Sequence, residues 1–219
     1  MDFEIKSFIL PVKTETISAE LYQPTTTKAV YVFAHGAGTD MHHKFMKDLA
    51  AELASLQVAT LRYNFLYSEQ KKRRPDFPAV AHLAVAAAIA KAHELFSTLP
   101  LIAGGKSFGG RMTSQYIAAN PLPFVSGLAF VGFPLHPAGK PATERATHLS
   151  GIKIPMLFLQ GTKDALATWE LITEVCSTLS TATLVPFEGA DHGFKAGKKN
   201  LVPEIAEEIN NWISGLHRS

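Results

Sequence analysis

Short apolar runs alternate along the chain with longer segments in which apolar residues recur at helical spacing. The short runs are apolar at successive positions, which is typical of parallel strands covered by helices on both faces. This pattern predicts six strands: Ala29–Ala34, Val58–Tyr63, Leu101–Gly104, Ser126–Val131, Met156–Gln160 and Thr183–Phe187. Two further runs, Phe3–Val12 and Thr16–Tyr22, are expected to form an antiparallel hairpin at one edge of the sheet.

Helical periodicity fills most of the gaps between these strands. One helix has apolar residues on a single face at 45–56, and Pro78 lies in the first turn of an alanine-rich helix that reaches Phe96. Further helices are expected from Arg111 onward, over 169–179 and from Pro203 onward. The alternation predicts an α/β fold with one mostly parallel, doubly wound sheet, in a single domain over residues 1–219.

The least regular stretches follow strands at the sheet edge where folds of this class bind ligands. They are Phe65–Phe77 and Phe133–Leu149. The second is too short to hold a large cap domain, so we expect an open or lightly covered site.

Composition narrows the class of protein. A chain of 219 residues, 47% hydrophobic and 18% charged, suits a soluble domain with a sizeable core. A formal net charge of +2 is too small to indicate nucleic-acid binding, and no apolar run is long enough to span a bilayer. The single cysteine, Cys176, excludes an intrachain disulfide, and we find no signal peptide, so a cytoplasmic location is expected. No metal site and no cofactor are predicted, and the oligomeric state is left open.

The motif with the clearest chemistry is Gly105-Lys106-Ser107-Phe108-Gly109, directly after a predicted strand. It reads G-x-S-x-G at a strand-to-helix turn, which lifts the serine hydroxyl clear of the sheet, and the glycines allow the tight turn. Ser107 is therefore a candidate nucleophile. A serine hydroxyl is a weak nucleophile, so it needs a general base, usually a histidine oriented by a carboxylate.

Both partners follow later strands in the order that such a fold requires. Asp164 lies in the turn after the strand ending at Gln160, and His192 lies in the turn after the strand ending at Phe187. An alternative role for Asp164 is to cap the next helix, and Asp191 is a rival acid. Because Asp191 directly precedes His192, the two side chains are expected to diverge, which favours Asp164.

The loop after the first parallel strand reads His35-Gly36-Ala37-Gly38. An oxyanion formed at the substrate needs backbone N–H donors. We expect one donor to be the N–H of Phe108 and the other that of Ala37, with Gly36 as the neighbouring alternative. His35 is interpreted as a residue that holds this loop.

Together these stretches resemble the α/β-hydrolase family, and more narrowly the KANL/Tex-like group of small hydrolases related to dienelactone hydrolase. The likeness also covers Leu61-Arg62-Tyr63-Asn64-Phe65 and the segment that begins Gly132-Phe133-Pro134-Leu135-His136-Pro137. The resemblance implies a hydrolase with a serine, aspartate and histidine triad. Dienelactone hydrolase carries a cysteine nucleophile where this chain has Ser107, which argues against a dienelactone substrate.

The sequence thus predicts a serine hydrolase that cleaves a small carboxylic ester or thioester through an acyl-enzyme. Two alternatives remain open: a non-catalytic binding protein with the same fold, and an acyltransferase or peptidase with the same triad. Candidate substrate contacts are Phe65, Tyr67, Phe133 and His136.

One concentrated charge run, Lys71-Lys72-Arg73-Arg74, lies in the loop after the second parallel strand. It is either a solvated loop or an attractor for an anionic substrate, such as an ester that bears a carboxylate or phosphate. Arg62 and Arg111 are further candidates for that role, and an alternative for Arg111 is a structural pair with a carboxylate.

Overall fold

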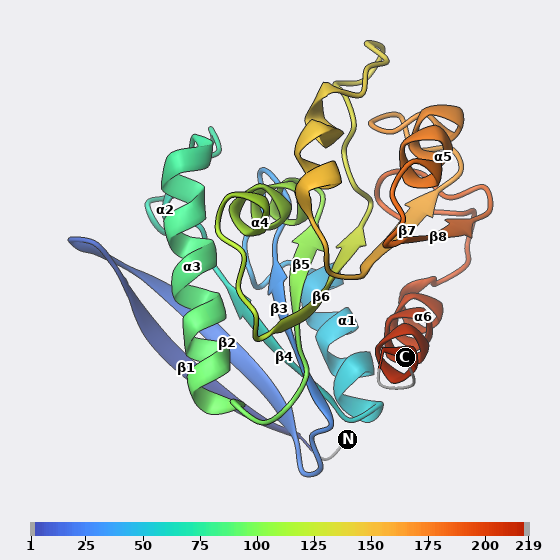
Figure 1. Cartoon of the computed structure of the whole chain (residues 1–219). Helices are drawn as coiled ribbons and strands as arrows, with labels where there is room; N and C mark the ends of the chain where they lie inside the picture. The colour runs from blue at the N-terminus through green and yellow to red at the C-terminus, as the bar shows by residue number, and fades with distance from the viewer. Residues whose placement is uncertain (1–2, 217–219) are drawn as a thin grey trace.

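The computed structural model describes residues 3–216. Its strands form one eight-stranded sheet in the order β1-β2-β4-β3-β5-β6-β7-β8 (Figure 1). They are β1 (Phe3–Val12), β2 (Glu15–Pro24), β3 (Ala29–Ala34), β4 (Val58–Tyr63), β5 (Leu101–Lys106), β6 (Val125–Val131), β7 (Met156–Gly161) and β8 (Ala182–Phe187). The β1–β2 hairpin joins the sheet antiparallel to β4, whereas β3 to β8 all run parallel.

Helices cover both faces of this sheet (Figure 1). They are α1 (Lys44–Ser55), α2 (Leu66–Glu69), α3 (Pro78–Leu95), α4 (Phe108–Ala119), the 3₁₀ helix η1 (Glu144–Gly151), α5 (Trp169–Ser177) and α6 (Val202–Gly215). One apolar core lies between the sheet and α1 with α6, and the other lies between the sheet and α3, α4 and α5. The predicted doubly wound α/β fold with an N-terminal hairpin is confirmed.

Burial explains why the strand residues are apolar at successive positions. Every residue of β3, β4 and β7 is buried, because helices pack against both faces of the central sheet. The outermost strand, β8, keeps most of its residues partly exposed. These differences follow from strand position, since an edge strand is covered on fewer sides.

Most boundaries differ from expectation by one to a few residues, and three differences bear on the site. The helix after the serine begins at Phe108, three residues before the predicted start at Arg111, because Ser107 itself is the N-cap residue. The two irregular stretches each contain one short helix, α2 and η1. Because η1 is the only helix between β6 and β7 in the described chain, no cap domain covers the sheet there.

The order of the strands fixes the place of the site. The chain leaves β3 to form β4 on one side and later places β5 on the other side. The loops after β3 and β5 therefore leave the sheet at a point where the strand order reverses, which is where open α/β sheets bind ligands. Ala34 and Gly105 are paired in register, so the two loops begin side by side.

Two glycines let α4 approach the end of β3. A Cβ atom on Gly109 would lie 2.6 Å from the Ala34 Cβ and from the carbonyl oxygens of Ala34 and His35. A Cβ atom on Gly105 would lie 2.5 Å from the Ala34 carbonyl oxygen. Glycine is therefore required on both sides of the serine by close backbone contact.

This contact predicts a stability effect at Gly109. We expect Gly109→Ala to lower the free energy of unfolding by about 1–3 kcal/mol, because the methyl group forces α4 away from β3. Gly151→Ala is the matched control, since a Cβ there meets nothing within 4 Å; we expect it to change stability by less than about 0.5 kcal/mol. Urea denaturation followed by circular dichroism measures both, and equal stabilities for the two variants would contradict the packing argument.

Candidate active site

Ser107 occupies a tight turn between β5 and α4. Its φ of 51° and ψ of −116° are unusual for a residue with a side chain, and such strain is commonly found at functional positions. Its N–H donates to the Val131 carbonyl at 3.1 Å, and its own carbonyl accepts the Arg111 N–H at 3.1 Å. These two bonds tie the turn to β6 and to the first turn of α4.

The structure brings Ser107, His192 and Asp164 into one hydrogen-bonded chain. His192 Nε2 lies 2.8 Å from Ser107 Oγ, and His192 Nδ1 lies 2.7 Å from Asp164 Oδ2. A carboxylate only accepts, so Nδ1 carries the proton and Nε2 is free to accept from the serine hydroxyl. The Asp164 side chain is fully buried, while a quarter of the His192 side chain is exposed. This is the arrangement in which a histidine can remove a proton from a serine.

Asp164 is oriented by Gln160, a residue that the sequence reasoning missed. Gln160 Oε1 accepts the Phe133 N–H at 2.9 Å, which turns its Nε2 toward Asp164 Oδ2 at 2.6 Å. The other carboxylate oxygen accepts the Leu166 N–H at 2.7 Å within the loop after β7, so Asp164 does not cap the next helix, α5, whose N-cap residue is Thr168. The signal available in the sequence was a polar residue directly after the apolar run 156–159, and the structure shows that its side chain is fully buried.

The rival acid has a different role. Asp191 Oδ1 accepts the N–H groups of Gly193 and Lys195 at 2.8 and 2.9 Å. Its carboxylate therefore stabilises the turn that carries His192, while Asp164 contacts the imidazole ring.

The loop after β3 fixes the orientation of the peptide unit between Gly36 and Ala37, two residues that line a cavity with Ser107. The Gly36 carbonyl accepts from His35 Nδ1 at 2.8 Å, from the Thr39 hydroxyl at 3.0 Å and from the Tyr67 hydroxyl at 3.2 Å. A trans peptide is planar, so the Ala37 N–H of the same unit points the other way. No hydrogen bond among residues 3–216 uses that N–H.

The second expected donor is the N–H of Phe108. Phe108 is the first residue of α4, where the N–H has no partner within the helix. As the first residue of α4, Phe108 also lies at the positive end of the helix dipole. The two donors come from different segments, Ala37 from the loop after β3 and Phe108 from the start of α4.

His35 is locked as a neutral ring. The Phe65 N–H donates to Nε2 at 3.2 Å, so the ring proton resides on Nδ1 and is donated to Gly36. Burial lowers the pKa of His35 from 6.5 to about 4. The residue therefore holds the loop as expected, without carrying charge near neutral pH.

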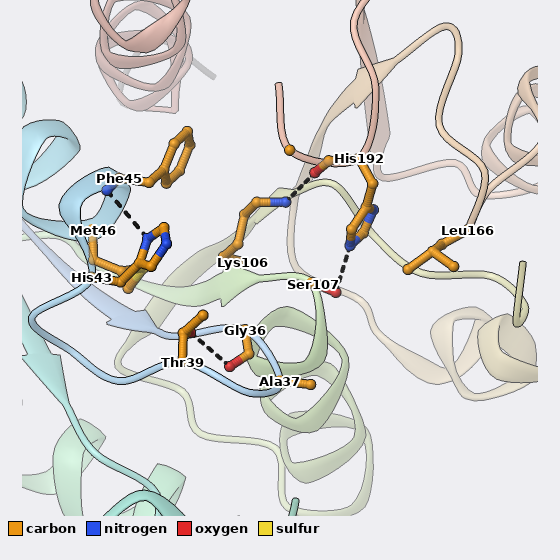
Figure 2. A pocket seen from close by; sticks show the side chains of 11 residues that line it. Gly36, Ala37, Thr39, His43, Phe45, Met46, Lys106, Ser107, Leu166 and His192 are labelled. Atoms are coloured by element: carbon orange, nitrogen blue, oxygen red, sulfur yellow. Dashed lines mark hydrogen bonds between the residues drawn. The ribbon is translucent and has the colours of Figure 1, made fainter. Parts of the chain in front are cut away.

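Two cavities meet at Ser107, and one of them is largely apolar. It holds about 290 Å³ and is lined by Phe45, Met46, Leu166 and the loop around Ala37 (Figure 2). Lys106 also projects into it, and its ammonium group donates to the His192 carbonyl oxygen at 2.5 Å (Figure 2). Burial lowers the pKa of Lys106 to about 8.

A family model described as an alpha/beta hydrolase domain matches residues 27–214. The chain belongs to the alpha/beta hydrolase domain family. The resemblance predicted from the sequence motifs is therefore confirmed.

Three solved structures share the fold of this family member over nearly its whole length. Dienelactone hydrolase from Anabaena variabilis is 17% identical, covers 98% of this chain and 99% of its own, and has a TM-score of 0.79. An alpha-beta serine hydrolase homologue from Coxiella burnetii is 19% identical with 95% of each chain covered and a TM-score of 0.74. A serine hydrolase without lid from Xanthomonas campestris is 18% identical, with 98% and 94% covered and a TM-score of 0.73.

Four side chains of this α/β-hydrolase were expected to contact substrate, but they do not line the cavities at Ser107. Phe65, Tyr67, Phe133 and His136 are all buried, and none lines either cavity at Ser107. Phe65 and Tyr67 pack around His35 and Phe108. The correction has a simple cause: their motifs follow strand ends, but the side chains turn inward to support the loops.

His136 has a supporting role of the same kind. Its Nε2 accepts the Thr168 N–H at 3.1 Å, and its Nδ1 donates to the Pro137 carbonyl at 2.9 Å. The ring thereby joins the segment after β6 to the loop after β7. That loop carries Leu166, which lines both cavities.

The charged residues that were candidates for attracting an anionic substrate lie in three different places. Lys71, Lys72 and Arg73 line a hollow with Gly38, Thr39 and Asp40, away from Ser107. Arg62 is fully buried, pairs with Glu20 at 2.9 Å and stacks on Tyr22, so it is a structural residue. Arg74 and Arg111 do line a cavity that contains Ser107.

Within residues 3–216 no three His, Cys, Asp or Glu side chains lie close enough together to hold a metal ion. The same residues include no helix that is both long and apolar enough to cross a membrane.

The locked state of His35 predicts how stability changes with pH. Its pKa is about 4 in the folded protein and 6.5 in an unfolded chain, so between these values the unfolded chain binds more protons. Stability contributed by neutral His35 is complete above pH 6.5 and falls by about 3 kcal/mol as the pH drops to 4. Denaturation of the protein and of His35→Gln across this range measures the effect. A difference between the two free energies that does not change with pH would contradict it.

Proposed function

We propose that this protein hydrolyses carboxylic esters or thioesters through a covalent acyl-enzyme on Ser107. The observation that carries the proposal is the hydrogen-bonded chain from Ser107 through His192 to buried Asp164, beside the free N–H groups of Ala37 and Phe108. The family membership and the relatives described as serine hydrolases support the same reaction class.

The first half of the reaction forms the acyl-enzyme. Ser107 Oγ attacks the carbonyl carbon while its proton passes to His192 Nε2. The carbonyl oxygen becomes an oxyanion, which accepts from the N–H groups of Ala37 and Phe108. Asp164 stabilises the imidazolium that forms. Collapse of the intermediate breaks the bond to the leaving group, which takes the proton from His192 and departs as an alcohol or thiol.

The second half releases the acid. A water molecule attacks the acyl carbon and gives its proton to His192 Nε2, forming a second tetrahedral intermediate at the same two donors. When this intermediate collapses, Ser107 Oγ leaves and recovers the proton from His192. The carboxylic acid product departs, and each residue is restored to its starting state.

The rigidity of the donors supports this assignment. Because the Gly36 carbonyl is held by three hydrogen bonds, the Ala37 N–H does not have to reorganise when charge develops. Preorganised donors of this kind are usually a large part of transition-state stabilisation. We also propose that the chain acts as a single domain in a cytoplasmic setting, in keeping with its one cysteine, which is free and buried.

Replacement of the nucleophile is the direct test. We expect Ser107→Ala to lower kcat for 4-nitrophenyl acetate by about 10³-fold or more, because no other group can form the acyl-enzyme. The unfolding midpoint of the variant verifies that the fold is intact. A fluorophosphonate probe should label the parent protein and not the variant. Full activity in the variant would reject the mechanism, and a folded parent protein that neither reacts nor labels would favour a non-catalytic binding protein.

Asp164 and Asp191, the two acids considered as partners of His192, give a matched comparison. We expect Asp164→Asn to lower kcat by about 10³- to 10⁴-fold, because an amide neither stabilises the imidazolium nor fixes the Nδ1–H tautomer. Asp191→Asn can still accept the two N–H groups of its turn, so its kcat should change by no more than a few-fold. Steady-state kinetics with one ester compares the variants, and the reverse order of effects would show that the acid has been assigned to the wrong residue.

A further inference from the structure

A second cavity lies on the other side of Ser107 from the apolar pocket. It holds about 540 Å³ and shares Ala37, Ser107 and Leu166 with that pocket. Its walls come from α4, η1 and the loop between α2 and α3. Three of the side chains that line it are Arg74, Arg111 and Arg145. A substrate carbonyl held at Ser107 would therefore have one part of the substrate in an apolar pocket and the other part against guanidinium groups.

These arginines have no acidic partner. None of the ion pairs within residues 3–216 involves Arg74, Arg111 or Arg145. The carboxylate that lines the cavity, Asp76, uses Oδ2 to accept the Tyr67 N–H at 3.0 Å. Arg111 Nε is buried and has no hydrogen-bond partner among the described residues. A buried donor without a partner is costly, so its presence beside a catalytic serine needs an explanation.

The local field is positive. Burial, and next the charge of Arg145, lower the pKa of Arg111. Burial and the charge of Arg111 lower the pKa of His148, on η1, to about 4. Like charges held together in a partly desolvated place destabilise the folded protein unless a negative charge joins them. An anionic ligand would relieve this repulsion.

Arg111 is rigidly placed relative to the nucleophile. It lies one helical turn after Ser107, and its N–H donates to the Ser107 carbonyl at 3.1 Å. Arg145 comes from η1, which packs against α4. The two guanidinium groups therefore approach the cavity from two elements. Planar guanidinium groups match the two oxygens of a carboxylate, and bonds of this kind are stronger than neutral ones.

We propose that the cavity lined by Arg74, Arg111 and Arg145 binds a carboxylate group of the substrate, so that the preferred substrates are anionic esters or thioesters. This inference rests on the proposed hydrolase function and deepens it. It also narrows the expectation from the charge run, because Lys71, Lys72 and Arg73 line a different hollow and only Arg74 of that run lines this cavity. The other two arginines, Arg111 and Arg145, are far from that run in the sequence.

Two pairs of esters test the proposal, and each pair differs by one charge. The first pair is mono-4-nitrophenyl adipate and 4-nitrophenyl hexanoate, which places the carboxylate on the acyl side. The second pair is 4-acetoxybenzoate and 4-acetoxybenzamide, which places it on the leaving-group side. We expect kcat/KM for the anionic member to exceed that of the neutral member by about tenfold or more in at least one pair. The pair that responds identifies which part of the substrate occupies the cavity.

Variants assign the preference to the arginines. In Arg111→Met and Arg145→Met the ratio of anionic to neutral kcat/KM should fall about tenfold, and in the double variant it should approach one. Arg111→Lys retains the charge but not the planar fork, so an intermediate ratio is expected. Arg73→Met is the matched control, because it removes one exposed arginine outside the cavity, and its ratio should equal that of the parent protein. Unfolding midpoints verify that each variant is folded.

Failure of the proposed anion site and failure of the proposed hydrolase function give different results in these assays. If the parent protein hydrolyses the neutral esters in a Ser107-dependent way but shows equal kcat/KM within both pairs, the inference is wrong and the hydrolase function stands. A preference that survives in the double variant also overturns it. If none of the four esters is hydrolysed and Ser107 resists a fluorophosphonate probe, the proposed function itself fails.

Discussion

The site depends on the close approach of α4 to the end of β3. Because Gly105 and Gly109 carry no side chain, the backbone of the serine turn lies directly against Ala34 and His35. That contact sets the distance between the loop after β3 and the serine turn, which carry the two proposed donors, Ala37 and Phe108, 71 positions apart in the chain. The order of the strands makes the approach possible, since β3 and β5 are neighbours where the strand order reverses.

Around this contact, polar groups are fixed by partners that do not take part in the chemistry. His35, Thr39 and Tyr67 hold one carbonyl, which aims one N–H. Gln160 holds Asp164, which orients His192. Each of these supports is buried or half-buried, where an unpaired polar group is costly, so the networks have few alternative arrangements. The result is a site that is already arranged before any substrate enters.

The fold and the three central residues could be predicted because each has a local signature. Runs of apolar residues give the parallel strands, and Ser107, Asp164 and His192 each follow a strand in a required order. The supports could not be predicted, because they depend on which way a side chain turns. Phe65 and Tyr67 follow a strand end as substrate contacts would, yet they pack inward under the loop. Gln160 becomes meaningful only when its neighbours across the sheet are known.

The placement of positive charge was only partly predictable, because Arg74 and Arg111 were among the candidates whereas Arg145 was not. The sequence shows one dense basic run, but density along the chain does not decide what a cavity contains. Arg111 and Arg145 are isolated in the sequence and meet only because η1 packs on α4. Lys106 lines the other cavity at Ser107, where its ammonium group donates to the backbone carbonyl of His192. The proposed anion site therefore lies in the cavity lined by Arg111 and Arg145, where Arg111 Nε has no hydrogen-bond partner among the described residues.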